Sequence, residues 1–131
     1  MPNKKIKKID ENAIVLKVKQ TTIDERGLYG AARYAWTLNI NNAAQAEYVI
    51  VATTGDGIIK EVYKNVKWRY TKDKDRIEFD ADVANDDIRI KYLFNILPDD
   101  YMQQGPAKPQ YTFDTISNYQ PDYDTNPIYR Y

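Results

Sequence analysis

The sequence predicts an α+β fold in a single domain, with a mostly antiparallel sheet and two to three short helices. Short segments in which apolar and polar residues alternate recur along the chain and predict strands. Two segments begin with helix-capping signals, and an Asp-Gly turn predicts a β-hairpin. The length of 131 residues is that of one ordinary domain, which buries roughly two thirds of its unfolded surface. We therefore expect one hydrophobic core.

The first expected elements are a strand and a helix. The segment "AIVLKVKQ" (13–20) alternates apolar and polar residues along part of its length and predicts a strand. A helix is predicted from about Ile23 to Leu38, because Thr22 and Glu25 have the spacing of a capping box. The two glycines of "RGLYGAAR" weaken that helix, since each costs roughly 1 kcal/mol relative to alanine. Its first part is alternatively a loop.

The predicted helix has two faces with separate chemistry. One face is small and apolar and consists of Leu28, Ala31, Ala32, Ala35 and Leu38. The other carries Tyr29, Arg33 and Trp36 at i, i+4 and i+7 spacing. We expect the apolar face to dock the helix on the core. The second face then points either at a ligand or at a buried structural partner.

The middle of the chain predicts a hairpin, two further strands and a second helix. "NNAAQAE" predicts a helical turn, and the Asp-Gly of "TTGDG" joins two apolar strands because both turn residues tolerate positive φ. The apolar positions between Val66 and Tyr70 alternate with basic residues and predict a strand or an extended link, and "RIEFDADVA" (76–84) predicts another strand. "NDDIRIKYLF" predicts a helix capped by Asn85 and stopped by Pro98. "QYTF" predicts a short closing strand.

The chain divides into three predicted regions. Residues 1–12 form a polar, basic N-terminal lead-in, and residues 13–113 form a single globular domain. Residues 114–131 form a tyrosine-rich, acidic C-terminal tail, because acidic residues and prolines argue against regular structure there.

Several function classes are excluded by composition. The chain has no histidine and no cysteine, and Ser117 is its only serine. Nucleophiles activated by histidine, histidine-ligated metals and disulfides are therefore impossible. Nineteen basic residues balance nineteen acidic ones, so no overall charge attracts the protein to nucleic acid or to a membrane. No apolar run is long enough to span a bilayer and the N-terminus lacks the apolar segment of a signal peptide, so we expect a cytoplasmic protein without a membrane partner.

Two patterns resemble functional motifs, but a purely structural role is favoured for each. "TTGDG" lacks the lysine and spacing of a phosphate-binding loop, so a hairpin turn is favoured. A cluster of carboxylates suits Mg²⁺ or Ca²⁺ and comprises Asp80, Asp82, Asp86 and Asp87. It lacks the glycine and distal glutamate of an EF-hand, so a solvated strand end and a helix cap are favoured. We expect no catalytic residue, metal or cofactor, with a carboxylate-dependent metal enzyme as the alternative.

The candidate ligand-binding residues are aromatic and basic: Tyr29, Arg33, Trp36, Trp68 and Arg69. Flat aromatic rings stack on bases, and arginine pairs with phosphates or base edges, so this set suits single-stranded nucleic acid or a nucleotide. The structural alternative places both tryptophans in the core between helix and sheet. In that case Arg33 needs a buried partner.

The order of these signals resembles a small family of uncharacterised bacterial and phage domains. The matching features are Tyr29, Arg33 and Trp36; "AEYVIV"; "GIIKEVY"; Trp68; "RIEF"; Tyr92 and Leu93; Pro98; and "GPAKPQY". That family is more remotely similar to PUA-like barrels, the group that includes domains reading modified bases. The resemblance implies a strongly curved sheet or barrel with an aromatic-lined pocket, and binding rather than catalysis. Lys108-Pro109 departs from the family's asparagine-proline, and "NPIYRY" (126–131) competes for the closing strand.

These observations lead to two hypotheses about function. The first is a non-catalytic module that binds nucleic acid or a nucleotide-like ligand through the aromatic and arginine residues. The second is a phage-encoded interaction protein that inhibits a host defence factor. In that hypothesis the tail presents Tyr119, Tyr123, Tyr129 and Tyr131 to a protein partner.

Overall fold

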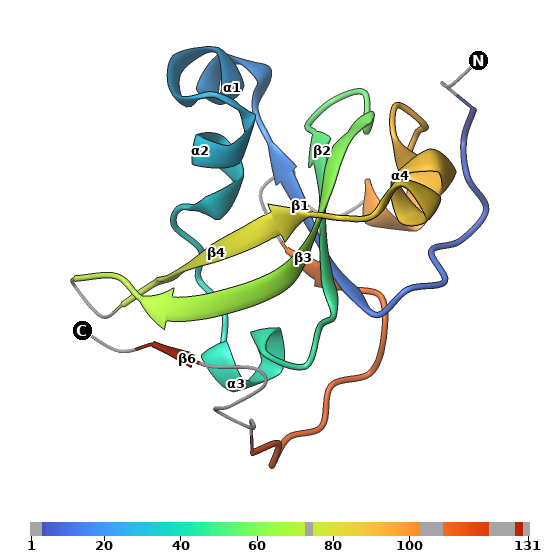
Figure 1. The fold of residues 1–131 in the computed structure, drawn as a ribbon. Coiled ribbons are helices and arrows are strands. Elements are labelled where there is room, and N and C mark those ends of the chain that lie inside the picture. The colour runs from blue at the N-terminus through green and yellow to red at the C-terminus, as the bar shows by residue number, and fades with distance from the viewer. Residues whose placement is uncertain (1–3, 73–74, 103–108, 121–127, 130–131) are drawn as a thin grey trace.

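A computed structural model describes residues 4–72, 75–102, 109–120 and 128–129 of the chain (Figure 1). The strands are β1 (Ala13–Val18), β2 (Tyr48–Thr53), β3 (Ile59–Tyr70), β4 (Ile77–Val83), β5 (Gln110–Tyr111) and β6 (Ile128–Tyr129). The helices are α1 (Gln20–Arg26), α2 (Leu28–Arg33), α3 (Ile40–Ala43), α4 (Asp86–Tyr92) and the 3₁₀ turn η1 (Asp99–Tyr101). The predicted α+β class is confirmed, with four short α-helices among the described residues where two to three were expected.

The sheet is mixed and open. Five strands follow the order β4-β3-β2-β1-β5, and β6 adds to β3 outside that path. The β1–β2 and β3–β6 pairs are parallel, and the other three pairs are antiparallel. The mostly antiparallel sheet is thus confirmed, and β3 curves along its length (Figure 1). The barrel form of the prediction is not confirmed, because the strand order among the described residues ends at β4 and β5 without closing.

Each face of the sheet carries its own hydrophobic cluster. Successive side chains of a strand point to opposite faces, and β1 is buried at all six positions. Ile14 and Leu16 pack with α2 and α3 on one face, whereas Ala13 and Val15 pack with Tyr92 of α4 on the other. The resulting layers are visible in Figure 1, where α1 and α2 lie on one side of the strands and α4 lies on the other. The parallel β1–β2 pair requires a crossover connection, which α1 to α3 supply.

A bulge in β3 switches its side chains from one face to the other. The pairing of β3 with β4 shifts register between Lys64 and Lys67, and Asn65 between them has a φ of 54°. Asparagine is one of the few residues that adopt this left-handed conformation readily. The extra residue lets Tyr63 and Trp68 share one hydrophobic cluster despite their odd and even positions.

The long helix predicted over residues 23–38 is wrong. The segment forms α1 and α2, separated by Gly27 at a φ of 78°, and the helix ends at Arg33 because Tyr34 is extended. The predicted capping box is also wrong, since α1 begins after Lys19 and contains Thr22. The apolar docking face is confirmed at its centre, where Ala31 and Ala32 are buried. The glycine that weakened the prediction is therefore the point at which the helix divides.

The second predicted helix is confirmed with an earlier end. α4 follows Asn85 as predicted and carries Asp86 and Asp87 in its first turn, where carboxylates favour the helix dipole. It ends six residues before Pro98, because Phe94 adopts a φ of 65° that no helix continues.

Segments from both predicted terminal regions lie on the domain. In the lead-in, the Ile6 amide donates to the Ile96 carbonyl at 3.0 Å, and Ile9 is buried. In the tail, the Ile116 amide donates to Gln45 Oε1 at 2.7 Å. Both candidates for the closing strand are placed, β5 beside β1 and β6 beside β3. Residues 105–108 of "GPAKPQY" lie outside the described residues.

A buried lysine connects β1 to the chain near β5. Lys17 is 2% exposed, and its Nζ donates to the Tyr101 carbonyl and, at 3.2 Å, to Gln110 Oε1. Burial lowers the pKa of Lys17, because the charged ammonium is poorly solvated there. The alternation of the strand placed Lys17 correctly among polar positions but could not show that β5 and η1 cover it.

We expect Tyr111→Phe to raise the free energy of unfolding by up to about 1 kcal/mol, because a buried hydroxyl without a partner is costly. The Tyr111 hydroxyl has no hydrogen-bond partner among the described residues, and burial raises its pKa to about 12. Urea denaturation measures the change. As the matched control, Tyr92→Phe removes a hydroxyl that donates to Glu11, and we expect it to cost about 2 kcal/mol. Similar losses from both variants would show that Tyr111 has a partner.

Candidate functional site

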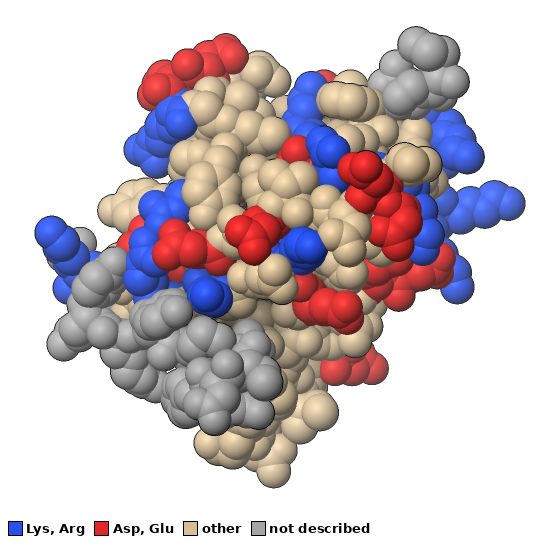
Figure 2. Space-filling view, viewed as in Figure 1, with Lys and Arg blue, Asp and Glu red and all other residues tan. Residues whose placement is uncertain are grey.

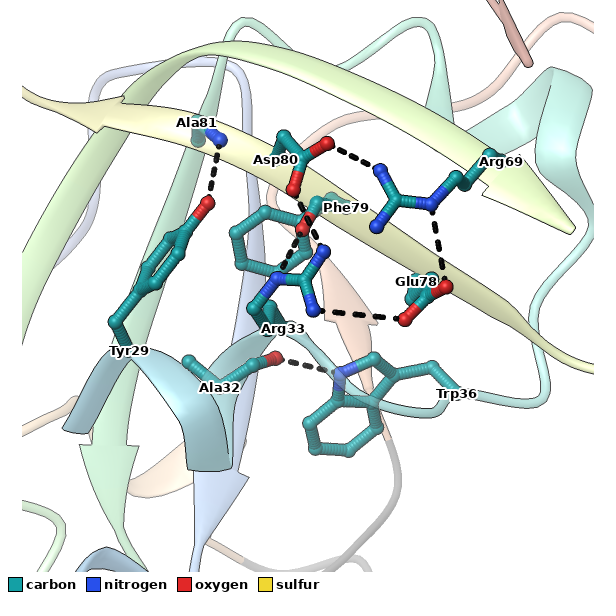
Figure 3. Close-up of polar contacts among 9 residues, drawn as sticks. All are labelled: Tyr29, Ala32, Arg33, Trp36, Arg69, Glu78, Phe79, Asp80 and Ala81. Atoms are coloured by element: carbon teal, nitrogen blue, oxygen red, sulfur yellow. Dashed lines mark hydrogen bonds and ion pairs between the residues drawn. The ribbon is translucent and has the colours of Figure 1, made fainter. Parts of the chain in front are cut away.

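Tyr29 and Arg33 of α2 bond the backbone of β4 along its outer edge (Figure 3). The Tyr29 hydroxyl accepts a hydrogen bond from the Ala81 amide at 3.0 Å. Arg33 Nε donates to the Phe79 carbonyl at 3.1 Å. Arg33 also lies over the Tyr29 ring, with its guanidinium carbon 5.8 Å from the ring centroid. These two side chains therefore fix α2 against the sheet.

Trp36 continues the same contact through its backbone. The Trp36 amide donates to the Ile77 carbonyl at 2.8 Å, and the Ile77 amide donates back to Trp36 at 2.9 Å. Its indole Nε1 donates to the Ala32 carbonyl at 2.7 Å, which holds the ring beside the end of α2. The indole nitrogen is thus occupied within the protein.

The three predicted site residues therefore act together as a cap on a sheet edge. β4 is the last strand at its end of the described sheet, and on that side both backbone groups of Ile77, the Phe79 carbonyl and the Ala81 amide have partners. In an edge strand, the amides and carbonyls of alternate residues point outward, where they can pair with another chain. Tyr29 contacts Ala81, Arg33 contacts Phe79 and Trp36 contacts Ile77, so the three residues follow β4 in the reverse direction.

Arg33 also belongs to a network of four charges (Figure 3). It lies 2.6 Å from Asp80 and 3.7 Å from Glu78. Arg69 of β3 pairs with the same two carboxylates, at 3.2 Å from Glu78 and in direct contact with Asp80. The Glu78 side chain is only 10% exposed, so it requires these partners. The structure thus gives Arg33 the buried structural partner that was the alternative to a ligand.

The network shifts the pKa values of its members in opposite directions. Burial alone raises the pKa of Asp80, but the hydrogen bonds and charges of Arg69 and Arg33 outweigh it and hold that pKa below its usual value. Burial alone lowers the pKa of Arg33, and Asp80 outweighs that effect, so the Arg33 pKa is raised. Both groups remain charged at neutral pH, as a structural ion pair requires.

Trp68 lies in the hydrophobic core. It is 1% exposed and packs edge-on against Phe79 with the ring centroids 5.1 Å apart. The prediction that Trp68 and Arg69 form one wall of a site does not fit this placement, because consecutive strand residues point to opposite faces. Trp68 cannot stack on a ligand without leaving the core. The structure brings Tyr29, Arg33 and Arg69 together at β4, and it places Trp68 in the hydrophobic cluster that α2 covers.

A cleft of about 630 Å³ lies beside the β3 bulge, and Asp80 of the charge network is one of its lining residues. Its walls come from the turn before β2, the bulge, the end of β4 and Tyr119 of the predicted tail. Its polar lining includes Gln45, Glu47, Tyr48, Lys64, Asn65, Lys67 and Asp82. This volume is within the range of small-molecule sites. On the face shown in Figure 2, basic and acidic side chains are interspersed rather than separated by sign.

The bulge positions the polar groups of the cleft. Asn65 Nδ2 donates to Asp82 Oδ2 at 3.0 Å, and Lys64 Nζ donates to Asn85 Oδ1 at 2.6 Å. Lys67 is exposed and forms no ion pair within the part of the chain that the structure describes. A cation at the rim of a cleft, beside amide and carboxylate groups, is suited to hold a polar ligand.

Sequence reasoning missed this cleft although one signal was present. In "EVYKNVKW" the adjacent apolar residues Val62 and Tyr63 break the alternation, which resumes at Val66 after an asparagine. A break in a two-residue period at an asparagine indicates a bulge, and bulges occur frequently beside functional sites. The cleft's other wall, from residues 44–48, depends on tertiary contacts that no local pattern shows.

The four aspartates proposed as an alternative metal site are not gathered. Asp80 pairs with two arginines, Asp82 accepts from Asn65, and Asp86 lies 3.6 Å from Arg89. Within the described ranges, no group of three or more carboxylates could hold a metal ion. Of the tail tyrosines, Tyr119 packs against the core, whereas Tyr123 and Tyr131 lie outside the described residues.

Comparisons of the chain with family models, with curated proteins and with solved structures gave no match. The resemblance to the bacterial and phage family therefore stays a prediction. None of the helices in the described parts of the chain is long and apolar enough to cross a membrane.

Proposed function

We propose that the protein is a non-catalytic binding module for a nucleotide-like ligand, which it holds in the cleft beside the β3 bulge. The observation that carries this proposal is the polar lining of the cleft, where Lys67 has no ion-pair partner among the described residues. The aromatic and arginine residues first predicted as the site have internal partners instead. Tyr29, Arg33 and Arg69 support the cleft by fixing β4, which forms one of its walls.

The lining chemistry matches the parts of a nucleotide. Lys64 and Lys67 supply ammonium groups for a phosphate, and tyrosine rings offer flat faces for a base. The amides of Asn65 and Gln45 suit base edges, and carboxylates such as Glu47 accept hydrogen bonds from ribose hydroxyls or base amino groups. A single nucleotide has all of these groups within the size of the cleft.

The charge balance favours a mononucleotide or a short single strand over a long nucleic acid. The chain has no net charge, and acidic side chains lie beside the lysines of the cleft. Binding to a polyanionic backbone requires several lysines or arginines arranged along one surface. The bacterial and phage family that the sequence resembles is remotely similar to PUA-like barrels, some of which read modified bases, and this similarity implies the same class of ligand.

We expect Lys67→Glu to weaken nucleotide binding at least tenfold without changing the melting temperature, because it reverses a charge that has no described ion-pair partner. The measurement is an NMR titration with mononucleotides and with short single-stranded DNA and RNA, at two salt concentrations. If the phosphate binds at the lysines, the amide signals of Asn65 to Lys67 are expected to shift, and binding is expected to weaken at the higher salt concentration.

The matched control is Lys19→Glu, which makes the same charge change at an exposed residue before α1 and outside the cleft. It is expected to leave binding unchanged within twofold. Equal losses in the two variants would mean that overall charge, not the cleft, controls binding. The absence of shifts with every probe would overturn the proposed function.

A further inference from the structure

The segment after β5 leads from the sheet to the cleft. Thr112 anchors its start, because the Ala13 amide donates to Thr112 Oγ1 at 2.9 Å and the Thr112 amide donates to the Ala13 carbonyl at 3.0 Å. Farther along, Ile116 is 59% exposed, and the two residues after it are exposed as well. Tyr119 is the next residue that is partly buried. It packs against the hydrophobic cluster on the α2 side of the sheet and lines the cleft.

One side chain from another part of the domain binds this segment. The planar amide of Gln45 contacts both backbone groups of Ile116, since Oε1 accepts from the Ile116 amide at 2.7 Å and Nε2 donates to the Ile116 carbonyl at 2.9 Å. Gln45 follows α3, and its Nε2 also lies 3.4 Å from Asn42 Oδ1. Two hydrogen bonds to one residue fix its orientation as well as its position. Gln45 therefore determines the direction of the chain at Ile116.

A turn connects Ile116 to Tyr119. The Tyr119 amide donates to the Ile116 carbonyl at 3.3 Å, across the exposed turn of Ser117 and Asn118. The Ile116 carbonyl thus accepts from Gln45 and from Tyr119, as the two lone pairs of a carbonyl oxygen allow. Because Gln45 orients Ile116 and the turn links Ile116 to Tyr119, the contact with Gln45 also places the Tyr119 ring at the cleft.

Two aromatic residues are among the described lining of the cleft, Tyr48 and Tyr119. Tyr48 packs against the other hydrophobic cluster, on the α4 side of the sheet. Burial and then nearby carboxylates, Glu47 and Glu11 among them, raise the pKa of Tyr48, so its ring lies in acidic surroundings. Negative charge there disfavours a phosphate-bearing ligand beside this ring. Tyr119, which reaches the cleft from the opposite side, is the better surface for stacking.

We infer that Tyr119 supplies the ring that stacks on the base of a bound nucleotide, and that Gln45 is the positioning residue that holds Tyr119 at the cleft through Ile116. The inference rests on the proposed function and assigns the base-binding wall of the same cleft. Stacking on a tyrosine ring tolerates every base, because each base has a flat π-face. Residues 114–119, which the sequence predicts to be a tail outside the domain, are therefore part of the ligand site.

The test is an NMR titration of the full chain with the adenosine, guanosine, cytidine and uridine monophosphates, and with ribose phosphate, which lacks a base. In Tyr119→Ala we expect the affinity for each nucleotide to fall at least tenfold, because the stack is lost, and the affinity for ribose phosphate to stay within twofold. Tyr119→Phe keeps the ring and is expected to retain nucleotide affinity within twofold. The matched control is Tyr34→Ala, at an exposed tyrosine outside the cleft, and it is expected to bind nucleotides like the unmodified chain.

A double-mutant cycle tests the positioning role of Gln45. Gln45→Ala alone is expected to weaken nucleotide binding at least fivefold and to speed hydrogen exchange at the Ile116 amide, which loses its acceptor. In the Tyr119→Ala background the same change is expected to have no further effect on nucleotide affinity, because Gln45 acts through Tyr119. Additive losses in the double variant would mean that Gln45 contacts the ligand itself, and would overturn the positioning role.

Failure of this inference and failure of the proposed function give different results. Unchanged nucleotide affinity in Tyr119→Ala, with binding still sensitive to Lys67→Glu, would overturn the role of Tyr119 and leave the cleft as the binding site. Equal losses for the nucleotides and for ribose phosphate in Tyr119→Ala would overturn it as well, since a probe without a base makes no stack. If no probe binds the unmodified chain, the proposed function is overturned and this assignment with it.

Discussion

Arg33→Ala is expected to lower the free energy of unfolding by about 3 kcal/mol, measured by urea denaturation. The variant leaves the Phe79 carbonyl without its described donor and removes one of the cations that pair with Glu78 and Asp80. Arg33 is 24% exposed and Glu78 is 10% exposed, so water compensates only in part. The loss is expected to exceed that of an ordinary surface ion pair, which contributes roughly 0–1 kcal/mol.

Two controls separate the role of Arg33 from a general effect of removing arginine. Arg26→Ala truncates an exposed arginine of α1 whose described contact is with the Tyr34 ring, and it is expected to cost under about 1 kcal/mol. Arg33→Lys keeps the charge but loses the fork of donors that reaches Phe79 and both carboxylates, so its stability is expected to lie between the other two. Unchanged stability of Arg33→Ala together with lost nucleotide binding would instead assign Arg33 to the ligand site.

The parts of the fold that the sequence predicts well are those that local chemistry determines. The hairpin between β2 and β3 is one such part, because Asp56 accepts from the Ile58 amide and Gly57 has a φ of 68°. The turn at α3 is another, since Asn39 accepts from the Asn42 amide at 3.0 Å. Each of these signals acts within a few residues, so a pattern in the sequence is sufficient to locate it.

Helix boundaries were less predictable because distant contacts decide them. Trp36 lies within the predicted helix, yet its backbone pairs with Ile77 of β4. Two backbone bonds to a strand edge and the extended residue Tyr34 thus replace the last turns of the helix. Propensity is a weak term beside such tertiary contacts, and nothing near Trp36 in the sequence indicates the pairing.

The predicted site residues Tyr29 and Arg33 share a helix face in the sequence, and in the structure both contact the backbone of β4. That they bind a ligand stays a prediction. The sequence cannot show that their partners are Ala81 and Phe79, roughly fifty residues later. It also could not fix the face on which Trp68 lies, because the bulge at Asn65 reverses the alternation that precedes it.

Trp68→Ala is expected to lower the free energy of unfolding by about 4 kcal/mol, because it leaves a large cavity against Phe79 in the centre of the core. Trp68→Phe is expected to cost less, since it keeps an aromatic ring and removes an indole nitrogen that has no described hydrogen-bond partner. Tyr34→Ala is the matched control at an aromatic residue that is 49% exposed, and it is expected to cost under about 1 kcal/mol.

The fluorescence of Trp68 distinguishes a core residue from a ligand-stacking one. In Trp36→Phe the indole of Trp68 is the only one in the chain, because the sequence has two tryptophans. A residue that is 1% exposed is expected to emit at short wavelength and to resist quenching by iodide, with and without nucleotide. Quenching of this emission by a nucleotide, at concentrations that leave the protein folded, would place the ring in the binding site. The expected result instead keeps Trp68 away from the ligand, in the core where it packs against Phe79 of β4.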